Sequence, residues 1–323
     1  MNVLVTGGAG FIGSHLVDLL EKNGKNVFVL DNSAYKNLIE SSNLKKSITY
    51  IKGDIRDTAM VEQLVSKVDT IYHLAAALGV NNILNSTLES ISTNIIGSDV
   101  VLKAATKFNK RILIASTSEI YGKNPKQPLS ENDDRVIGSP QKIRWSYSDS
   151  KAIEEAVATS LHISQNLKVI TVRLFNTVGP RQNLAYGMVL PNFVSNALKN
   201  ENLQVFGGGQ QTRVFCHISD VVTALVKLID ADKYWGEVFN IGGEGEISIL
   251  QLAERVIKVT KSNSKIQHVP YDLAYSTGFE DMARRVPDTT KLRNAIEWQP
   301  TMGLDEIISD LAKHLQVINL NLY

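Results

Sequence analysis

The first 14 residues limit the possible folds more than any other segment of this chain. An apolar run from Val3 to Val5 is typical of a buried parallel strand. Gly7, Gly10 and Gly13 follow with the spacing G-x-x-G-x-x-G, and an amphipathic stretch comes next. This order predicts a strand, a tight glycine turn and a helix, whose first N–H groups and positive dipole end can face a pyrophosphate.

We therefore expect a dinucleotide at this turn, in contact with Gly7, Gly10, Phe11 and Ile12. The next apolar run, residues 27–30, ends in Asp31 and Asn32, and Asp31 lies 18 residues after Gly13. A carboxylate at this place accepts hydrogen bonds from the adenosine ribose and repels a 2′-phosphate. The predicted cofactor is NAD rather than NADP.

Composition narrows the class of protein. The chain has 323 residues, 43% hydrophobic and 21% charged, and a net charge of +1, so we expect neither nucleic acid nor an anionic membrane as a partner. No apolar run approaches the length of a membrane span. One cysteine, Cys216, fits a reducing compartment, and we expect the cytoplasm. The six histidines show no ligand spacing, so no metal site is expected.

Strand and helix patterns alternate through the first half of the chain. Apolar runs predict strands at residues 3–6, 27–30, 48–52, 70–73, 111–115 and 169–174, with helical patterns between them, including a long one over 87–108. This rhythm is typical of an α/β fold with a doubly wound parallel Rossmann sheet.

The rhythm breaks after residue 175, which predicts a second, smaller and discontinuous lobe. We expect residues 1–175 to form the NAD-binding domain, joined by part of 212–241, because 221–229 has the pattern of a helix and 238–241 that of a strand. Residues 176–211 and 242–323 would then form the substrate-binding lobe.

Loops at the carboxyl ends of the strands are expected to complete the cofactor site. The small residues after the 70–73 strand, Leu74, Ala75 and Ala76, would let the nicotinamide end lie close. Asp54 and Ile55 follow the 48–52 strand, where the adenine is expected, and Asp54 could accept from its amino group.

Tyr147 and Lys151 stand four residues apart at the start of a predicted helix and share one face of it. An ammonium beside a phenol lowers the phenol's pKa, so Tyr147 could take a proton from a substrate hydroxyl while hydride leaves the same carbon. Lys151 could also bind the nicotinamide ribose. The 111–115 strand leads into Ser116, Thr117, Ser118 and Glu119, where a hydroxyl can hold the reacting oxygen.

With these motifs in place, the whole chain resembles the extended short-chain dehydrogenases/reductases that modify nucleotide sugars. The matching motifs, in chain order, are Thr6-Gly-Gly-Ala-Gly-Phe-Ile-Gly-Ser-His15, Gly53-Asp54, His73-Leu-Ala-Ala76, Ser116-Thr-Ser-Glu-Ile-Tyr-Gly122, Tyr147-x-x-x-Lys151, Arg173-Leu-Phe-Asn-Thr-Val-Gly-Pro-Arg181, Gln211-Thr-Arg213, Phe239-Asn-Ile-Gly242 and Arg285-Val-Pro-Asp288.

The resemblance implies a role for each matching position. Thr117, Tyr147 and Lys151 would be the catalytic hydroxyl, base and lysine, and Glu119 a further catalytic group. The substrate would be a nucleoside-diphosphate sugar, with UDP as the expected nucleotide. It would contact Thr117 and a set of residues further along: Asn176, Arg181, Val189 with the rest of 189–193, Phe206, Arg213 and Arg285. Guanidinium groups suit a diphosphate. The resemblance also implies a homodimer, joined through the 87–108 and 147–165 helices.

The family's shared first step is oxidation of the sugar at C4 by NAD+, and its branches differ in the later steps. Glu119 after Thr117-Ser118, together with Arg285 in Arg-x-Pro-Asp, favours UDP-glucuronate decarboxylation. A UDP-hexose or UDP-uronate 4-epimerase is the second interpretation and a 4,6-dehydratase the third. A non-catalytic NAD-binding regulator is disfavoured, because Thr117, Tyr147 and Lys151 are all present.

Overall fold

The computed structural model describes residues 1–33, 48–77, 86–270 and 282–320. Its centre is a seven-stranded parallel sheet with the strand order β11-β6-β5-β4-β1-β2-β3. The strands are β1 (Asn2–Thr6), β2 (Asn26–Asp31), β3 (Ile48–Lys52), β4 (Thr70–His73), β5 (Arg111–Thr117), β6 (Lys168–Leu174) and β11 (Val238–Ile241). All six strands expected in the first half are confirmed, and so is the return of residues 238–241 to the sheet.

The direction of strand addition reverses between β1 and β4. From β1 the chain adds β2 and β3 on one side, then crosses to add β4, β5 and β6 on the other. Dinucleotides bind at such a switch point, outside the carboxyl ends of the strands. The topology therefore brings the glycine turn after β1 and the loop after β4 to one place.

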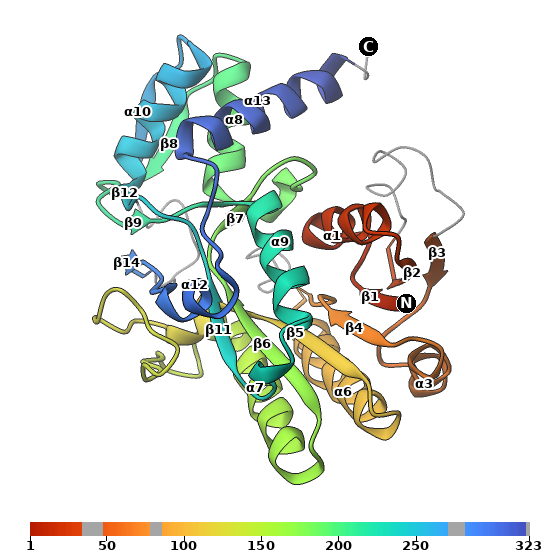
Figure 1. Cartoon of the computed structure of the whole chain (residues 1–323). Coiled ribbons are helices and arrows are strands. Elements are labelled where there is room, and N and C mark those ends of the chain that lie inside the picture. The colour runs from red at the N-terminus through yellow and green to blue at the C-terminus, as the bar shows by residue number, and fades with distance from the viewer. Residues whose placement is uncertain (34–47, 78–85, 271–281, 321–323) are drawn as a thin grey trace.

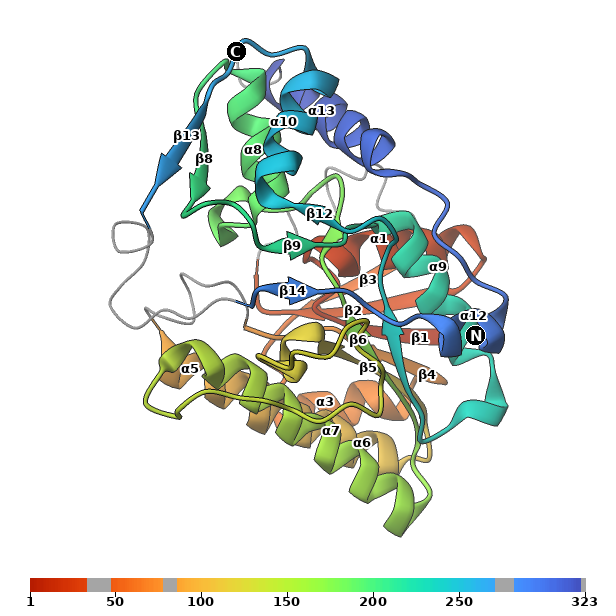
Figure 2. The ribbon, with the colours of Figure 1, turned by 90° about the vertical axis from the view of Figure 1, so that its left-hand side faces the viewer.

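Two helical layers cover the sheet (Figure 1). α1 (Phe11–Lys22), α9 (Ile218–Ile229) and α12 (Thr290–Ile296) lie on one face. α3 (Thr58–Ser66), α6 (Ser98–Lys107) and α7 (Ser146–Gln165) lie on the other, as Figure 2 shows from the side. Successive residues of β1 serve the two layers in turn: Val3 and Val5 pack in the core under α1 and α9, whereas Leu4 packs in the opposite core.

The expected 87–108 helix forms as three consecutive pieces. α5 (Thr87–Ser92) continues through a π-helical turn, η1 (Thr93–Gly97), into α6. Two short 3-10 segments near the end of β5 also matter for the site: η2 (Ser118–Tyr121) and η3 (Ile143–Trp145).

The smaller lobe has a core of its own. α8 (Val189–Leu198), α10 (Ile249–Thr260) and α13 (Leu304–Leu320) pack on one another beside the parallel pair β8 (Leu203–Phe206) and β13 (Ile266–Val269). Between this core and the large sheet lies a small sheet of β12 (Ile247–Ser248), β9 (Thr212–Arg213) and β14 (Arg284–Arg285), as Figure 2 shows. A second small sheet pairs β7 (Thr177–Val178) with β10 (Cys216–His217).

Part of the segment that we expected in the smaller lobe packs against the large sheet instead. We assigned residues 242–323 to the smaller lobe, but Leu292 on α12 and Trp298 are buried in the core of the large sheet. The indole N–H of Trp298 donates to the Asp220 carbonyl on α9 at 2.9 Å. Two apolar residues, one in a short helix and one just after it, carry no signal of which core they will join, so this third return of the chain to the large sheet was not predicted.

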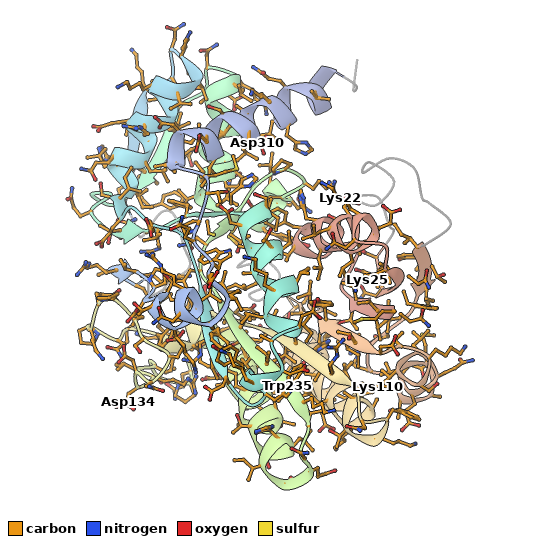
Figure 3. The ribbon with its side chains drawn as sticks, viewed as in Figure 1. Lys22, Lys25, Lys110, Asp134, Trp235 and Asp310 are labelled. Carbon is orange, nitrogen blue, oxygen red and sulfur yellow. The ribbon has the colours of Figure 1, made fainter. Side chains whose placement is uncertain are left out.

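Charged side chains of both signs are spread around the molecule (Figure 3), with Lys22 and Lys25 beside the end of α1 and Asp310 on α13. None of the helices in the described ranges has the length and apolar composition that a membrane crossing requires.

Candidate active site

The glycine turn after β1 is held by close backbone packing. Gly7 has φ of +72°, and a Cβ there would lie 2.7 Å from the backbone nitrogen of Ala75. A Cβ on Gly13 would lie 2.1 Å from the carbonyl oxygen of Gly7. Gly10 is the N-cap of α1, and no side chain caps the helix. The first-turn N–H groups are therefore available to a phosphate, as the predicted cofactor requires.

Asp31 is placed to hold a ribose beside this turn. One carboxylate oxygen accepts the Ala9 N–H at 2.9 Å, and the other accepts the backbone N–H and the hydroxyl of Ser33 at 2.9 and 2.7 Å. A carboxylate has about four acceptor positions, so it can still accept from a hydroxyl. Asn32 is exposed beside it, and Phe11 and Ile12 are partly buried at the start of α1.

Asp54 does not present a free carboxylate to an adenine. Arg56 folds back and binds both of its oxygens, with Nε to Oδ1 at 3.0 Å and Nη2 to Oδ2 at 2.6 Å. The hydrogen bonds from Arg56 lower the pKa of Asp54. The expected adenine contact would have to compete with this ion pair. Ile55 is buried in the core beneath the sheet.

The loop after β4 lies against the glycine turn, as expected for the nicotinamide end. The Leu74 N–H donates to the Thr6 carbonyl at 3.1 Å, and the Ala75 N–H donates to the Thr6 hydroxyl at 3.3 Å. Leu74, Ala75 and Ala76 are all partly buried. Ala75 and Ala76 carry only methyl groups, which suits the close approach expected of the nicotinamide end.

Tyr147 and Thr117 meet at the end of β5. Tyr147 lies in the first turn of α7, and its hydroxyl is hydrogen-bonded to the Thr117 side chain. Thr117 is the N-cap of η2, and its hydroxyl accepts the Glu119 N–H at 3.2 Å. The two hydroxyls expected to hold one substrate oxygen are thus in contact.

The expected effect of Lys151 on Tyr147 is wrong in this structure. Lys151 Nζ donates to Glu154 Oε2 at 2.7 Å, with 2% and 0% of the two side chains exposed. The pKa of Tyr147 is raised, first by burial and then by the charges of Glu119 and Glu154. The i, i+4 spacing predicted the shared helix face, but it could not show that the ammonium turns to a carboxylate three residues on.

Glu119 lies in a cluster of three arginines. Arg144 Nη1 donates to Oε2 at 2.7 Å and Arg144 Nη2 to Oε1 at 3.3 Å, while Arg285 Nη2 lies 3.7 Å from Oε1. Burial opposes ionisation of Glu119, but Arg144, Arg285 and Arg213 together outweigh it and the pKa is lowered. We call Glu119, Arg144, Arg213 and Arg285 the arginine cluster. Glu119 is therefore a carboxylate rather than a proton donor.

Arg144 was missed by the sequence analysis. It lies in η3, three residues before Tyr147, and only 8% of its side chain is exposed. Its guanidinium also stacks on the Trp145 ring at 5.3 Å from the centroid. The only sequence feature that could have indicated a role for Arg144 is its place three residues before Tyr147. That feature is weak, because a single arginine outside a motif is usually a surface charge.

Arg213 and Arg285 are brought together by strand pairing. They are direct partners in the parallel register of β9 and β14, and 7% and 9% of them are exposed. Arg213 Nη1 donates to the carbonyls of Thr212 and Met282, both at 2.8 Å. The pairing of the two strands thus places two buried guanidinium groups side by side, an arrangement that suits an anionic ligand.

The remaining expected substrate residues lie around the smaller lobe. Asn176 follows β6, and its side-chain amide donates to the Val214 carbonyl at 2.8 Å. Val189 begins α8 and Phe206 ends β8, both partly buried. Arg181 differs from the expectation, because its guanidinium pairs with Asp18 on α1 at 2.6 Å rather than joining the arginine cluster. Within the described ranges no three His, Cys, Asp or Glu side chains are grouped to hold a metal.

Comparison with known proteins agrees with this geometry. A family model described as GDP-mannose 4,6 dehydratase matches residues 4–311. The chain is 41% identical over 304 residues to UDP-N-acetyl-alpha-D-glucosaminuronate decarboxylase of Bacillus cytotoxicus, covering 94% of each chain. It is 36% identical to UDP-glucuronic acid decarboxylase 6 of Arabidopsis thaliana, covering 95% of this chain and 86% of the relative.

Solved structures of nucleotide-sugar epimerases share the fold of this chain. UDP-glucose 4-epimerase of Thermotoga maritima, solved with UDP-glucose, superposes with a TM-score of 0.87 at 30% identity, over 100% of both chains. UDP-glucuronic acid 4-epimerase of Bacillus cereus, solved with UDP-glucuronic acid and NAD, superposes with a TM-score of 0.88 at 26% identity, over 98% of this chain and 100% of that one. The chain belongs to the NAD-dependent epimerase/dehydratase family of extended short-chain dehydrogenases/reductases, and it is an NAD-dependent nucleotide-sugar-modifying enzyme.

Proposed function

We propose that this enzyme decarboxylates a UDP-linked hexuronate, with UDP-glucuronate and UDP-N-acetylglucosaminuronate as the candidate substrates. The observation that carries the proposal is the arginine cluster next to Tyr147. Three buried guanidinium groups surround one ionised carboxylate, Glu119. Guanidinium groups bind phosphate and carboxylate groups well, so this cluster suits a substrate that carries both a diphosphate and a sugar carboxylate. A neutral hexose would offer it only the diphosphate. The two decarboxylase relatives favour the same substrate class.

The chain's residues support a sequence of proton transfers. NAD+, held at the glycine turn and the loop after β4, would supply the hydride acceptor. Tyr147, hydrogen-bonded to Thr117, would take the proton of the C4 hydroxyl during oxidation at C4. The C4 ketone makes the C6 carboxylate a β-keto acid, so CO2 leaves and an enolate spans C4 and C5. Thr117, Tyr147 and Arg285 stabilise the enolate oxygen.

Protonation at C5 completes the decarboxylation. Because Glu119 is held ionised, we assign the donor to a water molecule polarised by Arg285 and oriented by Glu119; a proton from solvent neutralises the hydroxide that remains, so the reaction takes up one proton overall. Tyr147 would then give its proton back to the C4 oxygen when C4 is reduced again. This assignment replaces Glu119 as the direct acid, which the sequence left open.

The test is product analysis with both UDP-hexuronates and with UDP-glucose. We expect trapped CO2 and a pentose nucleotide, identified by NMR, from a hexuronate and neither from UDP-glucose. Tyr147→Phe should lower turnover by about 10²–10⁴-fold while the variant still binds nucleotide sugar. A C4 epimer without CO2 would make the enzyme a 4-epimerase, the alternative favoured by the likeness to the Bacillus cereus enzyme.

We also propose that the enzyme acts as a homodimer in the cytoplasm. The α6–α7 face of the sheet exposes Ile96 and Ile153, at 51% and 44%, beside a cavity of about 170 Å³ whose other apolar walls are Ile95, Leu102 and Val157. A second copy of the same face would cover these side chains.

The single, buried thiol of Cys216 suits a reducing compartment.

A further inference from the structure

Glu154 is a buried carboxylate that the proposed reaction does not use. It lies one helical turn from Lys151 on α7, and Lys151 Nζ donates to its Oε2 at 2.7 Å. Only 2% of the lysine side chain and 0% of the glutamate side chain are exposed. A buried ammonium and carboxylate at this distance form an ion pair, since either charge alone would be costly in the core.

A chain of hydrogen bonds from the opposite side also ends at Glu154. Thr6 Oγ1 accepts the Ala75 N–H and lies 2.7 Å from His73 Nδ1, and His73 Nε2 lies 3.0 Å from the Ser98 hydroxyl. Ser98 in turn is hydrogen-bonded to Glu154. Burial lowers the pKa of His73 to about 3, so its ring is neutral.

The direction of this chain follows from its donors. An ionised carboxylate can only accept, so Ser98 donates to Glu154, and the Ser98 oxygen is then left to accept the His73 Nε2 hydrogen. His73 Nδ1 in turn accepts the hydrogen of the Thr6 hydroxyl. Both Ser98 and Lys151 thus present hydrogens to the Glu154 side chain.

Two charged groups raise the pKa of Tyr147. One is Glu119 on η2, itself paired within the arginine cluster, and the other is Glu154 on α7. Around Glu154 the charged or titratable groups are Lys151 and Glu155 on α7, Asp99 on α6, and His73 behind Ser98. Burial raises the pKa of Glu154 and Glu155 adds to this, while Lys151 and Ser98 oppose them.

We infer that Glu154 is a positioning residue that anchors the Lys151 ammonium and opposes its effect on Tyr147 with a negative charge of its own. The inference rests on the proposed role of Tyr147 as the base. It explains why the pKa of Tyr147 is raised although the i, i+4 spacing suggested that Lys151 would lower it. Burial and the charges of Glu119 and Glu154 together keep the phenol protonated in the chain alone.

The decisive experiment is the pH dependence of hydride transfer in Glu154→Gln. The rise of NADH absorbance is measured after NAD+-loaded enzyme is mixed with UDP-hexuronate. The substituted amide would keep a hydrogen-bond acceptor for Lys151 but remove the negative charge. We expect the ascending limb of the rate profile to move to lower pH by about one unit. An unchanged limb, or one moved to higher pH, would overturn the inference.

Two further variants make this result specific. Glu154→Leu removes the same charge and suits the apolar walls formed by Leu102 and Val157, so it gives the same test if the glutamine variant does not fold. Glu155→Gln is the matched control, because this neighbouring carboxylate pairs with Arg173 at 2.8 Å instead. It should leave the pH profile in place, and an equal shift in this control would count against the inference.

The two proposals fail separately. If Tyr147→Phe forms NADH at the wild-type rate, the proposed base is wrong. If Tyr147→Phe is inactive and Glu154→Gln keeps the wild-type profile, only the role of Glu154 is wrong.

Discussion

Arg144 illustrates how one side chain sets the protonation state of another. Its two hydrogen bonds to Glu119 oppose the burial that would otherwise keep a carboxyl group neutral. Nothing in the local sequence distinguishes Arg144 from a surface arginine, whereas Glu119 could be predicted from its place after Thr117-Ser118. The sequence therefore could not decide whether Glu119 or a water molecule at Arg285 donates the proton, because the partner of Glu119 was unknown.

We predict that Arg144→Met raises the pKa of Glu119 and destabilises the fold by up to about 3 kcal/mol. The lowered pKa of Glu119 stabilises the wild type at pH values above its unfolded-state pKa of about 4.3, and this contribution is lost as the pH falls through the folded-state value. In the variant that acid-side dependence should disappear.

Urea unfolding at several pH values measures both effects. Arg255→Met is the matched control, because Arg255 pairs with Asp305 at the surface and its loss should leave the midpoint unchanged. Identical pH dependence in wild type and Arg144→Met would contradict the role of Arg144.

We also expect a single residue, Asp31, to select the cofactor. We predict that Asp31→Asn weakens NAD+ binding by about tenfold or more, because a charged acceptor for the ribose is lost. The ratio of NAD+ to NADP+ affinity should also fall, because the carboxylate no longer repels the 2′-phosphate. Calorimetric titration with both cofactors measures this. Asp57→Asn is a suitable control, since Asp57 caps α3 by accepting the Met60 N–H at 3.0 Å. Unchanged selectivity would show that another group excludes the 2′-phosphate.

At the scale of elements, helices and strands long enough to show a periodic apolar pattern could be predicted from the sequence, and the shortest strands could not. The six Rossmann strands and the long helices follow from such runs, because burial on both faces demands them. β9 and β14 have two residues each, too few for any pattern. The pairing of Arg213 with Arg285 depends on the register of these two strands, and only family resemblance suggested that both arginines belong to one site.

The turn between β1 and α1 gives a prediction at this scale. Gly13→Ala should destabilise the fold by about 1–3 kcal/mol and weaken NAD+ binding, because its Cβ would overlap the Gly7 carbonyl. Gly303→Ala is the control, since its nearest neighbour would be Glu306 Oε2 at 3.6 Å. Denaturation midpoints and NAD+ titration report both effects. Equal stability of the two variants would mean that the turn can relax.

For the whole molecule, the α6–α7 face gives the clearest expectation. Ile153→Glu would place a charge among the apolar walls of that face, so we predict that a homodimer in the wild type becomes a monomer. Sedimentation velocity measures the change. Val317→Glu on α13, where 56% of Val317 is exposed, should leave the dimer intact. A wild-type monomer, or a dimeric Ile153→Glu variant, would argue against this interface.

The place of β11 has a consequence for synthesis on the ribosome. β6 hydrogen-bonds to β11 through contacts such as the Thr171 N–H to the Glu237 carbonyl at 3.0 Å. About sixty residues, which include α8, β8 and α9, are made between these two strands. Until they have emerged, the nascent sheet ends in an open edge at β6, and the core beneath α9 is exposed to solvent. A polypeptide stalled near residue 200 would therefore carry nearly all of the nucleotide-binding segments yet remain a substrate for chaperones and prone to strand-to-strand association.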